Sequence, residues 1–569
     1  MHAIMKISID HLPAEVLLQV FVHVRRFKLF LDDSELWYRL LWVCKRWRTL
    51  VLEAPALWAT IGINKRMKRN LVEACLTFSK QALLQVDIRD TTTAQNAWIV
   101  ECLLPHLHRI RRLQIRDMED TADEALNTLL EKAMPALEEL GVGFTSKTRL
   151  RGPFELPPLM PFLHEPKDPF VWDLAHEHFP SLRSLFLGSA LKVNGSLPVF
   201  RRLRKLELSG CLCAPMSISE FAFYLNHLPE LEELTVDRFR PEIPVPPATP
   251  VLADPFHLPS SLRNFTLKDN YYYTIPFLSS FDLPAHMSVK IVRAQDFFDY
   301  GDIEFESYVN GFPMSVLYAL SPRRFSWPIL EEITSIELRH FLSSCFMIIG
   351  STPDGRTLEL VGIVPPEWPQ KHPKGSLLRL NTFNDLIKVF EQSPVDELFV
   401  NGHDAQEIDQ GAWGYALTVF SDLKRIKIDH TDSLTEFDAR LSLLEALQPA
   451  KRRRMQPRGD LQLTVPSPQL ESLVFTSSAD RKEDGEFSST LSHCLKIRKE
   501  RGCPLKHLHL YLDYSARPEC EEEAASVNAS RVETYRNALY ETVENLQLEV
   551  FNEYHRTRSS RLWYYEGHL

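Results

Sequence analysis

A repeated apolar pattern, L-x-x-L-x-L with Ile, Val or Phe in place of some leucines, runs along most of this chain of 569 residues. Its copies begin at Leu83, Ile110, Leu137, Leu182, Leu203, Leu231, Leu262, Ile333, Val395, Leu423, Leu470, Leu505 and Val543. The second half of each copy alternates like a short strand with one buried face, and the segments between copies have helical periodicity. One strand and one helix of this kind cannot bury their apolar sides alone, so neighbouring units must stack.

The spacing of the copies indicates a repeat architecture. Most copies in the first half of the chain start about 20 to 30 residues apart, close to the period of a leucine-rich repeat. We therefore predict an α/β fold in which residues 81–515 form an irregular leucine-rich-repeat solenoid, or horseshoe. Unrelated amphipathic strands in a mixed α/β domain are the alternative.

Departures from regular spacing predict insertions into this repeat array. Residues 149–170 and 240–259 are rich in proline, which lacks the N–H that an inner strand needs, so we expect loops there. Residues 344–364 are β-prone on both sides of Pro353-Asp354-Gly355, where Pro and Gly favour a turn. This segment is therefore expected to be a hairpin.

Charge and cysteine usage exclude several classes of function. The chain has 65 Lys and Arg against 75 Asp and Glu, a net charge of −10, which argues against nucleic acid or a membrane surface as partner. Its nine cysteines form no CxxC pair and are expected to be free thiols in a reducing compartment. Without a signal-peptide pattern or a long apolar run, we expect a cytoplasmic or nuclear protein, or one found in both. Lys451 to Arg454, KRRR, is either a nuclear-import signal or a solvated basic loop.

The N-terminal segment predicts two amphipathic helices. Pro13 suits the first position of a helix, and Val16, Leu17, Val20 and Phe21 follow at helical spacing. A second helix is expected to begin after residues 32–34, with apolar positions that recur every three or four residues up to Leu50. Two short helices have little core of their own, so one reading is a structural cap on a larger domain.

The amino-acid sequence of this segment resembles that of the F-box family. Leu12-Pro13-x-Glu15-Val16-Leu17, Val20-Phe21, Val43-Cys44-Lys45-x-Trp47 and Pro55-x-Leu57-Trp58 occur in the order typical of that family. F-box modules dock on the Skp adaptor of a cullin-RING ubiquitin ligase. The resemblance implies that role for Leu12, Pro13, Val16, Leu17, Val20, Val43, Cys44 and Trp47.

The resemblance and the repeats together give a domain order. We expect an F-box at 1–62, a helical linker at 63–80, the solenoid at 81–515, and a C-terminal helix, last repeat and tail at 516–569. In the last segment Ser530 and Glu533 form a capping-box pattern, which predicts a helix start. An N-terminal F-box before leucine-rich repeats resembles the substrate receptors of Skp-cullin-F-box (SCF) ligases, and the irregular spacing resembles the large F-box families of fungi.

The outward positions of the strands are the candidate target-binding face. Side chains alternate along a strand, so residues beside the buried positions line up across neighbouring repeats. These residues are Arg112, Gln114, Arg116, Lys205, Glu207, Glu233, Thr235, Asp237, Thr266, Lys268, Glu337, Arg339, Phe399, Arg425, Lys427, His507, His509 and Tyr511. Their mixed charge suits a protein substrate, whose identity is unknown.

No motif for catalysis, cofactor binding or a metal site is recognisable. The chain lacks a phosphate-binding glycine loop, a nucleophile elbow and a zinc-protease motif. The pairs His176-x-His178 and His507-x-His509 have spacing that suits two metal ligands, but no further ligands can be identified. We therefore predict a non-catalytic ligase subunit without cofactor. A scaffold or adaptor that binds Skp without assembling a ligase is the alternative, and an enzyme of unrecognised type is a third reading.

Overall fold

The computed structural model divides the chain into two compact units, Met1–Thr266 and Leu267–Leu569, and each is described by itself. Within them the structure describes residues 9, 12–28, 38–116, 124–143, 170–172, 175–188, 191–193, 200–210, 212–213, 216–239, 255–269, 271–294, 327–341, 345–363, 375–401, 408–429, 439–448, 465–477, 481–513 and 521–551. None of the helices formed by these residues has the length and hydropathy needed to cross a membrane.

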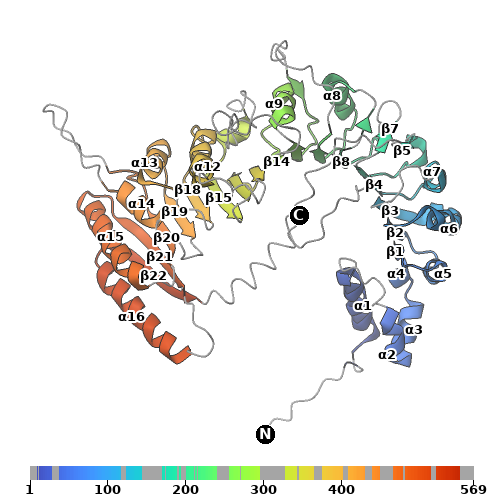
Figure 1. The fold of residues 1–569 in the computed structure, drawn as a ribbon, viewed down its shortest axis with the longest axis horizontal. Helices are drawn as coiled ribbons and strands as arrows, with labels where there is room; N and C mark the ends of the chain where they lie inside the picture. Colours follow the sequence, from blue (N-terminus) through green and yellow to red (C-terminus); the bar gives the residue numbers. More distant parts are fainter. Residues whose placement is uncertain are drawn as a thin grey trace, which may run out of the picture. The chain divides into compact units, whose positions relative to one another are not determined.

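Unit 1 begins with helices and continues as alternating strands and helices (Figure 1). The N-terminal helices are α1 (Ala14–Lys28), α2 (Leu40–Val43), α3 (Lys45–Glu53) and α4 (Pro55–Trp58). The later helical elements are α5 (Arg69–Phe78), α6 (Thr93–Leu103), η3 (Leu104–Arg109), α7 (Glu124–Leu130), η4 (His176–His178) and α8 (Ile218–Asn226). Helix α8 opens with a capping box in which the Ser217 hydroxyl and the Glu220 carboxylate satisfy each other's backbone N–H groups.

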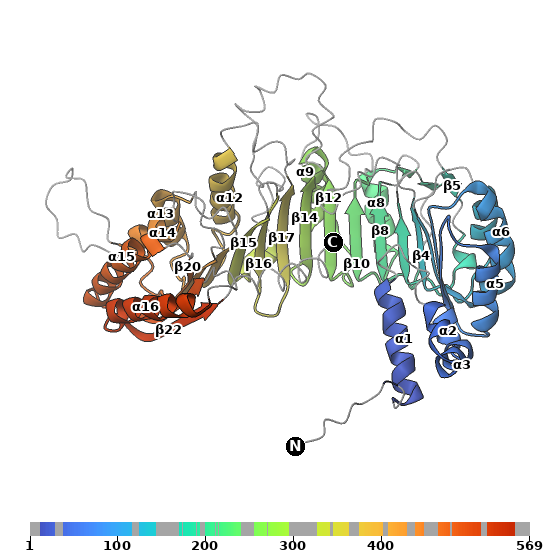
Figure 2. The same ribbon diagram turned by 60° about the horizontal axis from the view of Figure 1, so that its bottom comes forward.

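The strands of unit 1 form a parallel sheet in the order β1, β2, β3, β4, β6, β8, β10. Their bounds are β1 (Thr60–Ile63), β2 (Leu84–Arg89), β3 (Ile110–Arg116), β4 (Glu139–Gly143), β6 (Ser184–Leu187), β8 (Lys205–Ser209) and β10 (Glu233–Asp237). Figure 1 shows α5, α6 and α7 on one side of β1 to β4, and Figure 2 shows β4, β8 and β10 running alike. Shorter strands are β5 (Phe170–Trp172), β7 (Leu191–Val193), β9 (Leu212–Cys213) and β11 (Phe256–His257), and β12 (Asn264–Asp269) follows at the unit boundary.

The strands of unit 2 are mostly parallel, with one antiparallel insertion. In the order β14, β17, β16, β15, β18, β19, β20, β21, β22, all pairs are parallel except those that β16 makes with β15 and β17. Bounds are β13 (Phe281–Asp282), β14 (Ser288–Ala294), β15 (Ser335–Phe341), β16 (Cys345–Ser351), β17 (Thr357–Ile363), β18 (Glu397–Asn401), β19 (Arg425–Asp429), β20 (Ser472–Ser477), β21 (Leu505–Asp513) and β22 (Val543–Phe551). The helical elements are α9 (Tyr271–Ser280), η7 (Pro328–Glu331), α12 (Gly375–Val389), α13 (Gln410–Val419), α14 (Ala439–Ala446), α15 (Arg481–Glu500) and α16 (Glu521–Leu539).

The antiparallel insertion is the predicted hairpin. Strands β16 and β17 pair from Ser351 with Thr357 to Cys345 with Ile363. The turn between them uses Gly355 at φ 89°, a left-handed conformation that favours glycine. The Gly355 N–H donates to the Thr352 carbonyl, and the Thr352 N–H donates to the Arg356 carbonyl, so the backbone of the turn is satisfied.

Most apolar positions of the repeated pattern form the core in each unit. In unit 1 the buried Leu113, Leu140 and Leu185 face one another across three adjacent strands. In unit 2 the buried Leu398 and Ile426 are paired in the same way. Every copy of the pattern places its final L-x-L in a strand. Each unit therefore buries its leucines between a sheet and the helices along one side of it.

Three details differ from the sequence expectations. Leu83 is 50% exposed, and Leu84 is the buried residue at that place, because the pairing of β2 with β3 shifts between Leu84 and Gln85. The sheet begins at β1, before residue 81, where the repeats were expected to start. Helix α16 begins at Glu521, so the capping-box pattern at Ser530 lies inside it, and the Ser530 carbonyl accepts the Thr534 hydroxyl instead.

Most of the two predicted proline-rich loops, at 149–169 and 240–254, lies outside the described residues, as does the basic run Lys451 to Arg454. The predicted linker at 63–80 contains α5, as expected of a helical segment. Residues 255–259, at the end of the second loop, include the short strand β11.

Candidate functional site

The first helix of the N-terminal group presents two different sides. Leu17 and Phe21 are buried, at 0% and 1% exposure, and face the rest of the group. Val16 and Val20 lie on another side of the same helix and are each 41% exposed. Pro13, just before the helix, is exposed and Leu12 is half-buried. Helix α1 therefore leaves an apolar stripe, Pro13, Val16 and Val20, open to solvent.

A second group of exposed apolar residues comes from α2. Trp42 is 75% exposed and Val43 is 57% exposed. Cys44 is half-buried, has extended backbone and caps α3, because its Sγ accepts the Trp47 N–H at 3.4 Å. The extended Cys44 separates α2 from α3 and holds α2 as a short projecting turn.

Aromatic and backbone contacts tie these parts together. The rings of Phe21 on α1 and Trp47 on α3 have centroids 4.8 Å apart. The Arg46 guanidinium donates to the carbonyl of Leu12, and the Arg48 Nε donates to the carbonyl of Leu41 at 2.8 Å. These contacts fix the segment around Leu12 and the end of α2 to the same helix, α3. The two exposed apolar groups are thus held by one rigid element.

The helices are joined to the first repeat unit through buried groups. Burial lowers the pKa of Arg25 on α1 to about 10, although Cys75 and Tyr38 nearby oppose that shift. The Tyr38 hydroxyl lies 3.7 Å from the Cys75 Sγ on α5, and burial raises the pKa of that thiol. The Trp58 indole N–H donates to the Val51 carbonyl at 2.7 Å, and its ring lies 4.7 Å from that of Phe78. These contacts link α1, α3 and α5 through one core.

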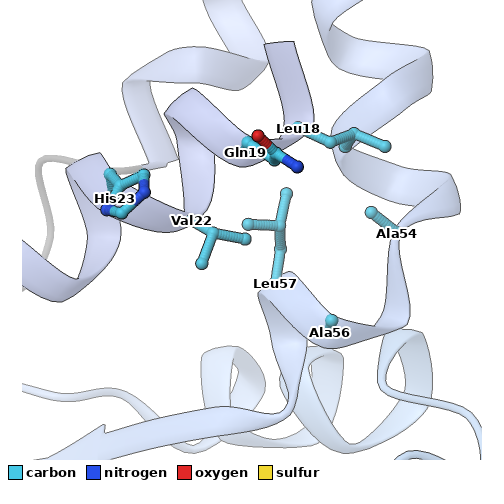
Figure 3. Close-up of a pocket in the computed structure, with 7 residues that line it drawn as sticks. All are labelled: Leu18, Gln19, Val22, His23, Ala54, Ala56 and Leu57. Atoms are coloured by element: carbon cyan, nitrogen blue, oxygen red, sulfur yellow. The ribbon is translucent and has the colours of Figure 1, made fainter. Parts of the chain in front are cut away.

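A small cavity lies between α1 and the junction of α3 with α4 (Figure 3). Its volume is about 220 Å³, and its walls are mainly apolar. Figure 3 shows Val22 of α1 and Leu57 of α4 projecting into the same space, with Ala54 and Ala56 beside them. Gln19 and His23 are the polar residues at its rim. The cavity offers apolar contact and no converging set of acids, bases or nucleophiles.

The predicted adaptor-binding residues fall into buried, half-buried and exposed groups. Leu17 is buried inside the module, while Cys44 and Trp47 are half-buried and support α3. Pro13, Val16, Val20 and Val43 are exposed, and Leu12 is partly so. Sequence reasoning missed two exposed residues, Trp42 and Ile9, the second being 49% exposed. The run Leu40 to Val43 contains a signal for the first, because four successive apolar residues on one short helix cannot all be buried.

On unit 1, cross-strand ion pairs occupy the predicted target-binding face. Arg112 Nε lies 3.3 Å from Glu139 on the next strand, and Lys205 Nζ lies 3.0 Å from Glu233. Arg116, Glu207, Thr235 and Asp237 are half-exposed on the same face. Thr266 and Lys268, on β12 at the unit boundary, are also half-exposed. Residues directly opposite in neighbouring strands interact in this way, so the missed partner Glu139 follows from the register.

Gln114 corrects the prediction for this face. Its side chain is only 8% exposed and lies over Gly141 on β4, where an added Cβ would collide with it. Gly141 pairs directly with Gln114, and its lack of a side chain leaves room for the amide. The Arg116 guanidinium donates to the Gln114 Oε1 at 3.0 Å. Gln114 therefore fills the surface of the sheet and is not an accessible contact residue.

On unit 2 the predicted face combines ion pairs with an aromatic and cationic cluster. Arg339 pairs with Glu337 at 2.6 Å, and Arg425 pairs with Glu397 of the neighbouring strand. Lys427 Nζ lies 4.4 Å from the centre of the Phe399 ring, within the range of a cation–π contact. We refer to Phe399, Lys427, His509 and Tyr511 as the aromatic–lysine cluster.

The two histidines of β21 lie on this face. The rings of His509 and Tyr511 have centroids 4.0 Å apart, and His509 Nε2 is 3.4 Å from a Glu549 carboxylate oxygen. Burial lowers the pKa of His509, while Glu549 acts in the opposite direction. The exposed His507 lies 3.4 Å from the Asn545 amide. His176 and His178 lie in η4 on unit 1, and among the described residues no three potential metal ligands gather.

Comparison with known families matches the same N-terminal region. The F-box-like family model matches residues 9–64, which span α1 to α4 and β1. No curated protein matches the chain. The match ends where the first strand of the sheet ends, so it covers the exposed apolar residues and the helices that hold them. Residues 9–64 therefore form an F-box-like domain.

Proposed function

We propose that this chain is the substrate-recognition subunit of an SCF-type ubiquitin ligase. In this role the F-box-like domain binds the Skp adaptor, and through it a cullin-RING ligase, while the repeat region binds a target protein. The observation that carries the proposal is the F-box-like domain, in which apolar residues of both α1 and α2 are left exposed. The chain would supply no catalytic residue.

The docking side of the proposal rests on Pro13, Val16, Val20, Trp42 and Val43. Exposed apolar side chains gathered in one small region are typical of a partner surface. Arg46 and the Phe21–Trp47 contact hold α1 and the segment before it against α3, and Arg48 holds α2, before any partner arrives. A surface ordered in advance loses less conformational entropy on binding. We therefore assign the adaptor contact to these side chains, with Leu17 acting from inside.

The target side of the proposal rests on the regular sheets. Leucines in register across parallel strands, with helices along one side, support the interpretation of the repeat region as a leucine-rich-repeat-like solenoid. The opposite side of the strands carries the ion-paired and aromatic residues described above. Ion pairs leave little net charge on this side, which favours a folded protein or peptide over a polyanion. The aromatic–lysine cluster is the strongest candidate for an anchoring contact, because aromatic residues dominate interface energetics.

The proposed mechanism is proximity. Two binding sites on one chain turn the meeting of ligase and target into an effectively intramolecular event. The buried groups around Arg25, Tyr38 and Cys75 attach the F-box-like helices firmly to the first repeat unit. Such an attachment limits the range of positions that the adaptor can take relative to unit 1.

Affinity purification of the intact chain beside a Leu12→Ala/Pro13→Ala variant tests the proposal. We expect mass spectrometry to find Skp and a cullin only with the intact chain, because truncating an anchor at an interface centre costs about 2 kcal/mol or more. Phe223→Ala is the matched control, since Phe223 is 69% exposed on α8, outside the F-box-like domain. Skp without a cullin would favour a scaffold or adaptor role, and equal recovery of Skp with both forms would contradict the assignment.

A further inference from the structure

The first and last strands of the repeat region are covered to different extents. On β1, Ile61 and Ile63 are each 1% exposed, and the adjoining α4 contributes the buried Leu57 and Trp58. On β22, the corresponding apolar residues Leu546 and Leu548 are only half-buried. The F-box-like helices thus cover the edge strand of unit 1, whereas β22 lacks an equivalent cover among the described residues.

Comparison with β21 shows how incomplete the burial of β22 is. Leu508, Leu510 and Leu512 of β21 are 1%, 0% and 0% exposed. They pair in register with Leu546, Leu548 and Val550, of which Val550 is 43% exposed. Tyr540, just before β22, is 76% exposed. A repeat array normally ends in a unit with a polar outer face, so this apolar end is unusual.

The backbone of β22 pairs on one side only among the residues that the structure describes. Within the described part of the chain, β21 is the only strand that pairs with this nine-residue strand. Its sequence, VENLQLEVF, contains no proline or lysine, the residues that usually prevent an edge from pairing. A long strand with free N–H and carbonyl groups is a template for a further strand.

We propose that the free edge of β22 pairs antiparallel with β22 of a second copy of this chain. The strand is self-complementary about Gln547. In that register Asn545 faces Glu549 of the other copy, Leu546 faces Leu548, and Glu544 faces Val550. This register puts the Asn545 amide, a donor, opposite the Glu549 carboxylate, an acceptor, and no two like charges stand opposite each other.

The symmetry of this pairing explains the exposed apolar residues. A two-fold axis midway between the two facing Gln547 residues and perpendicular to the sheet makes one continuous sheet from two copies and keeps both α16 helices on the same face. Leu546, Leu548 and Val550 of each copy would then gain neighbours on the side that β21 does not cover. This interface lies outside the F-box-like domain, so it is independent of the proposed ligase function.

The test is the molar mass of the full chain by light scattering over a range of micromolar concentrations. We expect a mass that rises toward that of two chains. Asn545→Glu places two carboxylates opposite each other at both ends of the interface and should weaken the dimer about tenfold. Adding Glu549→Lys to that variant should restore it. Ser472→Glu is the control, because Ser472 lies in the same outward row on the interior strand β20.

Each outcome bears on the proposal. A monomer at all concentrations overturns it, and so does a dimer that Asn545→Glu leaves unchanged. A dimer weakened by Asn545→Glu but not restored by the double variant overturns the register about Gln547. Circular dichroism of the variants separates loss of pairing from loss of fold, and equal weakening by Ser472→Glu would point away from the β22 edge.

Discussion

Among the described residues of the F-box-like domain, Trp42 is the most exposed large apolar side chain, at 75%. We expect Trp42→Ala to weaken Skp binding by about 2 kcal/mol or more without changing the fold. A Trp side chain that becomes buried when a partner binds is a typical interface anchor. Isothermal titration with the purified adaptor measures the change. Phe223→Ala removes a similarly exposed aromatic ring elsewhere and should leave the affinity unaltered. Equal affinities for the Trp42 variant and the parent chain would rule out α2 as a contact.

Arg109 acts at the same scale but inside the fold. Its guanidinium donates to the Leu76 carbonyl, the Ser79 hydroxyl and the Ala82 carbonyl, and the residue is 4% exposed. Arg109→Ala removes the guanidinium from these acceptors at the end of α5, although the Leu76 carbonyl keeps the Ser79 hydroxyl as a donor, so we expect a loss of about 3 kcal/mol in the free energy of unfolding. Urea denaturation provides the value. Arg111→Ala breaks only an exposed pair with Glu138 and should cost less than about 1 kcal/mol; similar losses in both would refute the role of Arg109.

At the scale of elements, the hairpin turn between β16 and β17 gives a prediction of defined sign. Gly355 has φ 89°, so Gly355→Ala forces a side chain into a left-handed conformation and should destabilise unit 2 by about 1 kcal/mol. Gly414 lies within α13 with open space around it, so Gly414→Ala should instead stabilise the chain by up to about 1 kcal/mol. Chemical denaturation of the two variants compares them, and a shift of the same sign in both would contradict the argument.

The elements also show what could be predicted from the sequence. The strands and the hairpin follow from local alternation, spacing and turn residues, and both are present. The prediction that Leu83 is buried was wrong, because the pairing shift beside Leu84 depends on the neighbouring strand. A local sequence pattern contains no information about that strand. The prediction that a helix begins at Ser530 was wrong, because the two-residue capping-box pattern also occurs inside helices. The burial of Gln114 could not be predicted without knowing that Gly141 lies opposite it on the next strand.

The same limit applies to the candidate site. Helical spacing separated the buried Leu17 and Phe21 from polar positions, but it did not separate them from Val16 and Val20. Which apolar residues of a short helix face the core depends on where the other helices lie. The ion pairs of the sheets, such as Lys205 with Glu233, likewise depend on a register that only the assembled strands define.

At the scale of the whole molecule, the proposed function requires two sites that act separately. The F-box-like residues belong to helices before β1, and the aromatic–lysine cluster belongs to strands of unit 2. A variant in one site should therefore leave binding at the other unchanged, since sites in separate compact units usually act additively. This separation distinguishes a receptor from a chain in which the F-box-like helices are merely a structural cap.

We expect Phe399→Ala/Lys427→Ala to lose target proteins while it retains Skp, and Leu12→Ala/Pro13→Ala to lose Skp while it retains the targets. The first pair removes the cation–π contact on the outward side of β18 and β19, where both side chains are partly exposed and support no core. Quantitative mass spectrometry of proteins recovered with each variant and with the parent chain measures both losses. Thr235→Ala, on the outward side of β10 in unit 1, controls for a general change in surface. Loss of Skp from the Phe399 and Lys427 variant would show that the two sites are coupled. Retention of every co-purifying protein would move the target contact away from this cluster.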